Sequence, residues 1–272
     1  MSDQYALIGN PVAHSFSPLI HAEFARQTGQ DIEYTRLLAP LDGFAATVAQ
    51  FRTQGGKGLN VTLPFKLEAY RLATQRSARA EQAQVVNTLK FEDDQVFGDN
   101  TDGAGLVRDI EVNLGFPVVA MRVLLMGAGG AARGALPALL EKKPVTVVIA
   151  NRTAAKAHEL AQRFAHLGCS GCGYDELANR QFDLIVNATS ASIAGELPPL
   201  PPGLFAPRSL GYDMMYGSAP TPFLEFARAQ GARSADGSGM LIEQAAESFL
   251  VWRGVRPDTA PVIARLRAGG FL

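Results

Sequence analysis

Cysteine is almost absent from the sequence, which has only Cys169 and Cys172 in 272 residues. This excludes the disulfide framework of a small secreted domain. The C-x-x-C spacing of the pair allows two free thiols, a redox-active pair or half of a zinc site. We favour two free thiols, because there is no second pair and the nearest histidines, His158 and His166, lie in a predicted helix. We therefore expect no metal site.

Long apolar runs and an excess of one charge are missing as well. No run reaches the roughly 18 apolar residues of a membrane span, and the N-terminus has an early acid, Asp3, and no basic-then-apolar signal pattern. With 25 basic and 26 acidic residues, the formal charge of −1 favours neither nucleic acid nor membrane as a partner. We expect a globular cytoplasmic protein of one large or two ordinary domains.

Residues 122–134, RVLLMGAGGAARG, form the most informative stretch. They predict a buried strand, a tight glycine turn and the start of a helix. Gly127 and Gly129 let the backbone turn sharply and approach a ligand, and the helix start offers N–H groups to a diphosphate. The spacing is G-x-G-x-x-A, with Ala132 in the third small position. Such turns also occur without a ligand, but the strand–turn–helix context favours a dinucleotide.

The end of the next predicted strand, 145–149, indicates which dinucleotide binds. An NAD site places an acid there to hold the ribose 2′-hydroxyl. This chain instead has Arg152, with Lys156 one helical turn later. Guanidinium and ammonium groups suit a 2′-phosphate, so the sequence favours NADP over NAD. Thr153 is also the predicted N-cap of the helix over 154–166.

A second group of polar residues follows a predicted strand in the first hundred residues. Asn60 and Thr62 alternate with apolar residues and so share one face of that strand. Lys66 follows at a predicted helix start, where a cation is mildly unfavourable. Local stability therefore does not explain this lysine, although a solvated surface position remains an alternative.

Three further polar residues each have a structural alternative. Ser17, before Pro18, predicts a helix N-cap, although Ser15 and Ser17 together offer two hydroxyl donors to a carboxylate. Asp102 can cap the predicted helix over 103–114. Gln244 shares a helix face with small and apolar residues, where it could be a satisfied buried amide.

The chain resembles the shikimate dehydrogenase family over nearly its whole length. The motifs that carry the resemblance appear in one order and spacing, and together they are highly specific. They are 15–18 (SFSP), 60–66 (NVTLPFK), 86–88 (VNT), 98–103 (GDNTDG), 127–131 (GAGGA), 151–153 (NRT), 187–190 (NATS), 212–214 (YDM) and 236–240 (DGSGM).

The resemblance implies an α/β protein of two domains. Residues 1–102, completed by the C-terminal helices of 237–272, would form an α/β substrate domain, and residues 103–236 a Rossmann-type NADP domain. It also implies NADP-dependent interconversion of 3-dehydroshikimate and shikimate, in aromatic amino-acid biosynthesis through chorismate. The oligomeric state is left open between monomer and homodimer.

The resemblance further implies which residues contact each ligand. Three would hold the substrate carboxylate, namely Ser15, Ser17 and Tyr216. Six would surround the substrate's hydroxyls and ring, namely Asn60, Thr62, Lys66, Asn87, Asp102 and Gln244. The cofactor would be lined by Gly127, Ala128, Gly129, Gly130, Ala131, Asn151, Arg152, Thr153, Lys156, Thr189, Ser190, Met214 and Gly237. Lys156 stands where an arginine is common in the family, so we expect a less directional phosphate contact there.

Ketone reduction by hydride explains why such polar residues are needed. Negative charge develops on the substrate oxygen, and a cation or proton donor there stabilises the transition state. Lys66 fits that role, while Asp102 can orient the reacting hydroxyl and favour the ammonium form of Lys66. Such a pair titrates as a unit, so neither is singled out as the base. A quinate/shikimate dehydrogenase and a non-catalytic nucleotide sensor on the same fold are the alternatives.

Overall fold

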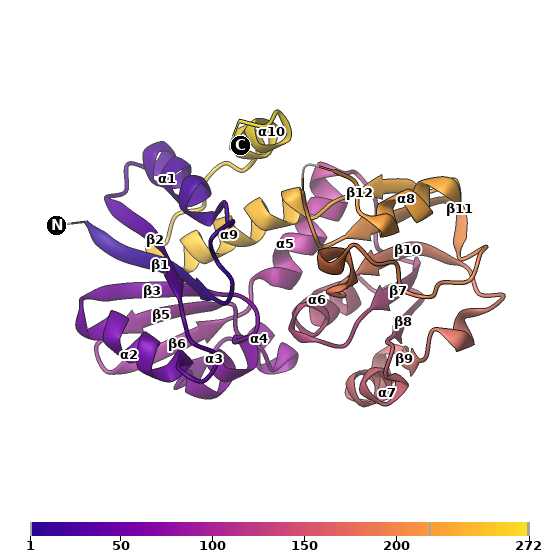
Figure 1. Cartoon of the computed structure of the whole chain (residues 1–272), viewed down its shortest axis with the longest axis horizontal. Helices are drawn as coiled ribbons and strands as arrows, with labels where there is room; N and C mark the ends of the chain where they lie inside the picture. Colours follow the sequence, from indigo (N-terminus) through magenta and orange to yellow (C-terminus); the bar gives the residue numbers. More distant parts are fainter. Residues whose placement is uncertain (1, 218, 271–272) are drawn as a thin grey trace. The chain divides into compact units, whose positions relative to one another are not determined.

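The computed structural model describes residues 2–217 and 219–270, which divide into two compact units (Figure 1). The first unit contains the chain up to Gly105 and again from Leu241 onward, and the second contains Leu106–Met240. The chain crosses between the units inside helix α5 (Asp102–Arg108) and inside helix α9 (Ser238–Arg253). None of the described helices is long and apolar enough to span a bilayer.

The first unit is built on a mixed six-stranded sheet of order β2-β1-β3-β5-β6-β4. The three strands β2, β1 and β3 run parallel, whereas β5 is antiparallel to both β3 and β6. The strands are β1 (Asp3–Gly9), β2 (Ile32–Leu38), β3 (Gly56–Val61), β4 (Gln75–Arg76), β5 (Thr88–Glu92) and β6 (Gln95–Asp99). The helices, besides α9, are α1 (Ser17–Thr28), α2 (Phe44–Thr53), α3 (Lys66–Leu72), α4 (Ala78–Ala83) and α10 (Ala260–Arg267).

Side chains of strand β1 alternate between two apolar cores. Ala6 and Ile8 join the core that contains Phe44 and Phe65 from the α2 and α3 region. Tyr5 and Leu7 point to the other face and join a core that contains a residue of α9. Because a strand presents successive side chains to opposite faces, both faces of this sheet must be covered. The returning α9 helps to cover one of them.

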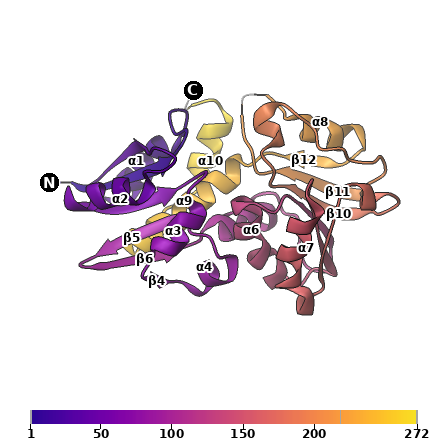
Figure 2. The same ribbon diagram turned by 60° about the horizontal axis from the view of Figure 1, so that its bottom comes forward.

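The second unit is a fully parallel six-stranded sheet of order β12-β11-β10-β7-β8-β9 (Figure 1). Figure 2 labels β10, β11 and β12 in a second view. Counted along this unit, the order is that of a doubly wound dinucleotide-binding fold. The predicted Rossmann-type domain is therefore confirmed as a fold. Its strands are β7 (Arg122–Met126), β8 (Thr146–Ala150), β9 (Cys169–Cys172), β10 (Phe182–Asn187), β11 (Phe205–Asp213) and β12 (Arg233–Ala235). Its longer helices are α6 (Gly130–Glu141), α7 (Ala154–Gln162) and α8 (Pro222–Ala229).

Strand β7 has a continuous apolar run because both of its faces are buried. Val123 and Leu125 lie in one core, and Leu124 and Met126 lie in the core on the opposite face. All four are fully buried. A strand buried on both faces reads as a continuous apolar run rather than as an alternation.

The predicted helix over 103–114 differs in its second half. The α-helix α5 ends at Arg108, and η1 (Asp109–Asn113) continues it as one π-helical turn. Asp109 is fully buried there, and its Oδ2 accepts a hydrogen bond of 2.7 Å from the Tyr212 hydroxyl. A π-turn shifts the hydrogen-bond register locally, which sequence periodicity does not reveal.

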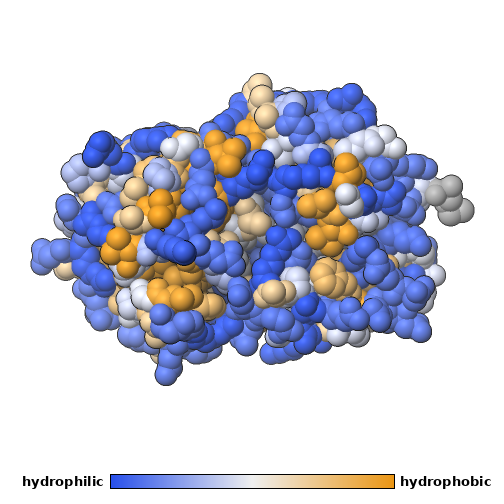
Figure 3. Space-filling view, turned by 180° about the vertical axis from the view of Figure 1, so that it is seen from behind, coloured by the Kyte–Doolittle hydropathy of each residue, from blue (hydrophilic) through white to orange (hydrophobic). Residues whose placement is uncertain are grey.

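The surface in Figure 3 carries apolar groups among hydrophilic ones. The exposed large apolar side chains of the first unit include Leu38, Leu41 and Leu63. Single exposed apolar residues are normal on protein surfaces.

We expect Phe249→Ala to lower the free energy of unfolding by about 3–5 kcal/mol, because Phe249 on α9 is fully buried and its loss leaves a cavity. Its neighbour Leu250 is 36% exposed, so Leu250→Ala should change stability by about 0.5 kcal/mol or less. Urea unfolding measures both. Equal effects of the two substitutions would contradict the role of α9 as a core element.

Candidate functional site

A buried ion pair lies at the centre of the polar residues in the first unit. Lys66 begins α3 and its Nζ donates to Oδ2 of Asp102, the first residue of α5, at 2.5 Å. The two side chains are only 13% and 6% exposed. A buried charge is costly unless it is paired, so the lysine is not a solvated surface residue.

Asn87 holds the other side of this pair. Its Nδ2 donates to Asp102 Oδ1 at 2.8 Å and to Thr101 Oγ1 at 2.8 Å. Its Oδ1 accepts from the Thr101 backbone N–H at 2.9 Å and from Thr88 Oγ1 at 2.9 Å. Saturated in this way, the amide has one orientation, and the carboxylate of Asp102 is fixed between Asn87 and Lys66.

Gln244 extends this group from α9. Its Oε1 lies 3.4 Å from Asn87 Nδ2, and its Nε2 donates to the Leu241 carbonyl at 2.8 Å. The nearby Gly105 has no room for a side chain, since a Cβ there would lie 2.6 Å from the Gln244 backbone nitrogen. The structure therefore brings together Lys66, Asp102, Asn87 and Gln244.

Asn60 is embedded in a second cluster that the sequence did not indicate. Its Oδ1 accepts from the Tyr34 hydroxyl at 2.8 Å, and its Nδ2 donates to Ser248 Oγ at 2.9 Å. Ser248 Oγ also lies 2.7 Å from Thr88 Oγ1. Both the oxygen and the nitrogen of the Asn60 side-chain amide thus have protein partners, and the residue is 5% exposed.

The paired serines lie at the start of α1. Ser15 Oγ donates to Ser17 Oγ at 3.0 Å, and accepts from the Ser17 backbone N–H at 3.2 Å. The prediction of Ser17 as N-cap is wrong, because Ser17 is already helical and Phe16 precedes the helix without a side-chain cap. Pro18 occupies the second helical position, which shifts the start by one residue. Thr62, just after β3, donates its backbone N–H to the Ile8 carbonyl at 3.0 Å.

In the second unit, the glycine turn follows β7 as predicted. Gly127 has φ of 106°, which disfavours other residues, and a Cβ there would lie 3.0 Å from the Ala188 carbonyl oxygen. Ala128 is buried, whereas Gly129 is exposed and a Cβ on it would meet nothing within 4 Å. The first helical bond of α6 runs from the Arg133 N–H to Gly129. The earlier N–H groups, at Gly130 and Ala131, are those a helix leaves for an anion.

The basic residues follow β8 at the neighbouring strand end. Asn151 Nδ2 donates to the Thr153 carbonyl at 3.0 Å, which shapes the turn. Arg152 and Lys156 are both exposed. Thr153 is the N-cap residue of α7, as predicted, although its hydroxyl makes no capping hydrogen bond. The turn fits a phosphate, because it offers two cationic side chains. It follows β8, which pairs with β7, the strand that precedes the glycine turn.

Two further loops end β10 and β11. Thr189 donates its hydroxyl to Asn187 Oδ1 at 2.7 Å, and Ser190 after it is exposed. Met214 donates its N–H to the Asn187 carbonyl at 2.9 Å. Gly237 packs so closely that a Cβ on it would lie 2.2 Å from the Met214 carbonyl oxygen. Residues Thr189, Met214 and Gly237 thus come together at one edge of the sheet.

Tyr216 belongs to the second unit, three residues after β11. Burial raises the pKa of its hydroxyl. The two cysteines lie in β9 as free thiols, which confirms that interpretation. Burial raises the pKa of Cys169 to about 12, so its reactive thiolate is suppressed.

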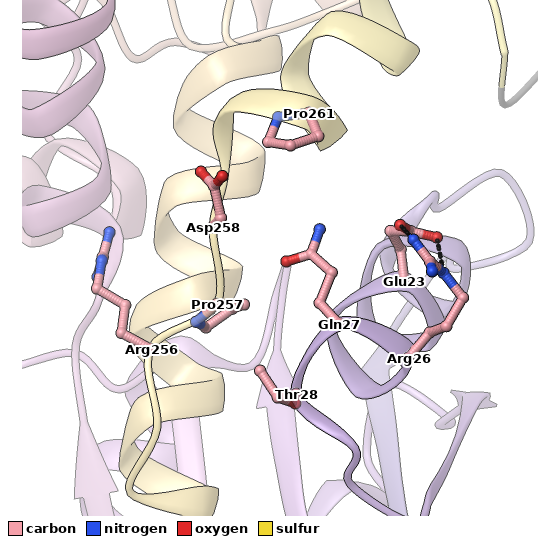
Figure 4. A pocket seen from close by; sticks show the side chains of 8 residues that line it. All are labelled: Glu23, Arg26, Gln27, Thr28, Arg256, Pro257, Asp258 and Pro261. Carbon is pink, nitrogen blue, oxygen red and sulfur yellow. Dashed lines mark hydrogen bonds and ion pairs between the residues drawn. The ribbon is translucent and has the colours of Figure 1, made fainter.

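A pocket in the first unit contains none of these residues. Figure 4 shows that α1, the segment between α9 and α10, and the start of α10 form it. It is lined by Glu23, Arg26, Gln27, Thr28, Arg256, Pro257, Asp258 and Pro261. Its arginines are already paired, Arg26 with Glu23 at 2.5 Å and Arg256 with Glu243 at 2.7 Å. The charges of these two arginines are therefore already neutralised by protein carboxylates.

Together, a doubly wound sheet with a glycine turn and a unit with a buried lysine–aspartate pair define a dinucleotide-dependent oxidoreductase. Three family models match the chain. They describe a shikimate dehydrogenase substrate binding domain (residues 7–89), a shikimate/quinate 5-dehydrogenase (113–194) and a shikimate 5′-dehydrogenase C-terminal domain (237–267). The chain belongs to the shikimate dehydrogenase family.

Individual relatives agree with this assignment. The shikimate dehydrogenase (NADP⁺) of Nitrosospira multiformis is 62% identical over 270 residues, which cover 98% of each chain. A crystal structure of an Ael1 enzyme from Pseudomonas putida is 53% identical, with a TM-score of 0.91 over 97% of this chain and 98% of that one. Shikimate 5-dehydrogenase from Thermus thermophilus, in complex with NADP(H) and shikimate, is 31% identical, with a TM-score of 0.87 over 98% and 99%.

A buried histidine beneath the Asn60 cluster makes stability depend on pH. The His21 ring stacks on Tyr34 with centroids 4.2 Å apart, and desolvation lowers its pKa from 6.5 to about 3. Between these pH values the unfolded chain binds more protons than the folded one. The histidine's contribution to stability is therefore complete above pH 6.5 and is lost as the pH falls toward 3.

We expect the free energy of unfolding to fall by about 2 kcal/mol between pH 7 and pH 5 on account of His21 alone. The variant His21→Phe keeps an aromatic ring at this position and should lose that part of the pH dependence. Urea titrations of both proteins at the two pH values measure the difference. The same loss in both proteins would show that His21 is not responsible.

Proposed function

We propose that the protein catalyses the reversible reduction of 3-dehydroshikimate to shikimate with NADPH, a step of aromatic amino-acid biosynthesis that leads to chorismate. The observation that carries this proposal is the buried Lys66–Asp102 pair, held in one geometry by Asn87. An ion pair enclosed in this way is costly to fold, and function is the better reason for it.

The side chains of the first unit explain how the reaction proceeds. Bound NADPH supplies the hydride. Lys66 donates a hydrogen bond, and then its proton, to the oxygen that gains negative charge, and in the reverse direction it takes the proton back. Asp102 orients the reacting hydroxyl and stays aligned because Asn87 holds its second oxygen.

We assign the remaining residues to the two ligands by unit. The proposed substrate domain is 1–102 with 237–272, where Ser15 and Ser17 would present hydroxyls to a carboxylate. A contact of Tyr216 with the same carboxylate stays a prediction from the sequence. Asn60, Thr62, Asn87 and Gln244 surround the ring. Support comes from the shared hydrogen bonds of Asn60, Asn87 and Gln244.

The proposed cofactor domain, 103–236, nearly coincides with the second unit, Leu106–Met240, which also contains Gly237. The diphosphate is proposed to lie on the turn from Gly127 to Ala131, and the 2′-phosphate on the turn from Asn151 to Lys156. Thr189, Ser190, Met214 and Gly237 line the other half of the cofactor. A cytoplasmic location, the absence of a nucleic-acid partner, and a monomeric or homodimeric state stay predictions from the sequence.

Two other functions make different demands on the same residues. A quinate/shikimate dehydrogenase would turn over both acids. A nucleotide sensor would need neither Lys66 nor Asp102. The ion pair favours an enzyme over a sensor, and the arginine after β8 favours NADP.

The deciding experiment follows the absorbance of reduced nicotinamide with shikimate or quinate and with NADP⁺ or NAD⁺. We expect turnover of shikimate with NADP⁺ to exceed the other three combinations. Lys66→Ala should lower kcat at least about a hundredfold. Lys57→Ala, an exposed lysine on β3, is the matched control and should retain full activity. Full turnover by Lys66→Ala would remove the catalytic assignment.

We expect Arg152→Ala to raise KM for NADP⁺ about tenfold or more, because a charged hydrogen bond to the 2′-phosphate is lost. KM for NAD⁺, which lacks that phosphate, should change little. Steady-state kinetics with each cofactor measures the two values. An equal rise for both cofactors would contradict the role of Arg152.

A further inference from the structure

A buried aspartate of the second unit is not accounted for by any role above. Asp213 ends β11 and is fully buried. Its Oδ2 accepts from Thr221 Oγ1 at 2.6 Å, from Ser192 Oγ at 2.7 Å and from Asn187 Nδ2 at 3.2 Å. Its Oδ1 accepts from the Met215 backbone N–H at 3.0 Å.

Two of these donors, Asn187 and Ser192, come from the end of β10 and the segment after it, and the other two, Met215 and Thr221, come from the segment after β11. Asn187 ends β10 and itself holds Thr189, by accepting from its N–H at 3.1 Å and its hydroxyl at 2.7 Å. Ser192 lies in the same loop after β10, two residues beyond Ser190, while Met215 belongs to the loop after β11. A single carboxylate therefore ties the loop that carries Thr189 and Ser190 to the loop that carries Met214.

The place of this carboxylate in the sheet indicates which half of the cofactor it serves. The order is β11-β10-β7-β8, with the glycine turn after β7 and Arg152 after β8. A dinucleotide with its diphosphate at the glycine turn and its 2′-phosphate at Arg152 must extend its other half toward β10 and β11. Asp213 lies at that end.

We propose that Asp213 is a positioning residue for the nicotinamide half of NADP, which it serves by holding the loops after β10 and β11 together. The proposal rests on the cofactor assignment made above. It makes a contact between Asp213 and the cofactor unnecessary. The expected consequence is selective, because the adenosine half is bound at the opposite side of the glycine turn.

The test compares Asp213→Asn with Asp183→Asn. Asparagine keeps the size of the side chain but has one acceptor oxygen, so an NH₂ must face at least one of the donors to Asp213. Asp183 is the second residue of the same strand, β10, and accepts three hydrogen bonds from Arg122 at 2.8–2.9 Å. Its substitution perturbs the same sheet at the amino ends of the strands, away from the loops, and so serves as the control.

The probes are NADPH, whose fluorescence reports binding, and adenosine 2′,5′-bisphosphate, which has only the adenosine half and is measured by calorimetry. We expect Asp213→Asn to raise the Kd of NADPH about tenfold or more, and to leave the Kd of the bisphosphate within about twofold. Asp183→Asn should leave both constants unchanged. Thermal melting of each variant reports its stability separately.

Three results would overturn the proposal. They are an unchanged Kd of NADPH for Asp213→Asn, an equal loss of both probes, and an equal loss of NADPH binding in the Asp183 variant. If Asp213→Asn does not fold, Thr221→Val removes one donor and should raise the NADPH Kd in the same direction by a smaller factor. Failure of the proposed reaction is seen separately, as wild-type protein that binds NADPH without oxidising shikimate.

Discussion

The hydrogen-bonded ion pair between Lys66 and Asp102 is the interaction around which the first unit is arranged. Two opposite charges that are nearly excluded from water must keep their partners, because an unpaired one would cost several kcal/mol. Asn87, directly before β5, donates a hydrogen bond to Asp102, and Gln244 of α9 lies beside Asn87. The polar centre therefore lowers the free energy of unfolding of the first unit relative to a core with apolar side chains in its place.

Under the proposed function, the two units bind their ligands by different physical means. The first presents side chains, each fixed by neighbours with saturated hydrogen bonds, such as Asn60 between Tyr34 and Ser248. The second combines backbone geometry, with the N–H groups that open α6 and a glycine at φ 106°, with the exposed cations Arg152 and Lys156. Side-chain networks specify a shape, whereas a helix start recognises charge in general.

Much of this arrangement can be predicted from sequence, because it depends on local chemistry. The strand–turn–helix at 122–134 follows from glycine and apolar patterning, and Arg152 from its place after a strand. The partners of Asn60 could not be predicted, since Tyr34 and Ser248 are distant in sequence and look like ordinary strand and helix residues. The cap prediction for Ser17 is wrong because proline occurs at the first and at the second helical position, so a serine before a proline can be either the N-cap or the first helical residue.

The route of the chain through the two units has a consequence for synthesis. The second unit is contiguous, from Leu106 to Met240, whereas the first needs α9, which the ribosome makes after it. Until α9 emerges, the face of β1 that bears Tyr5 and Leu7 lacks the Trp252 ring that packs there. Domains usually form as units during translation. Here the segment made first is the last to complete its core, and a nascent chain arrested before residue 240 would expose that apolar face to chaperones.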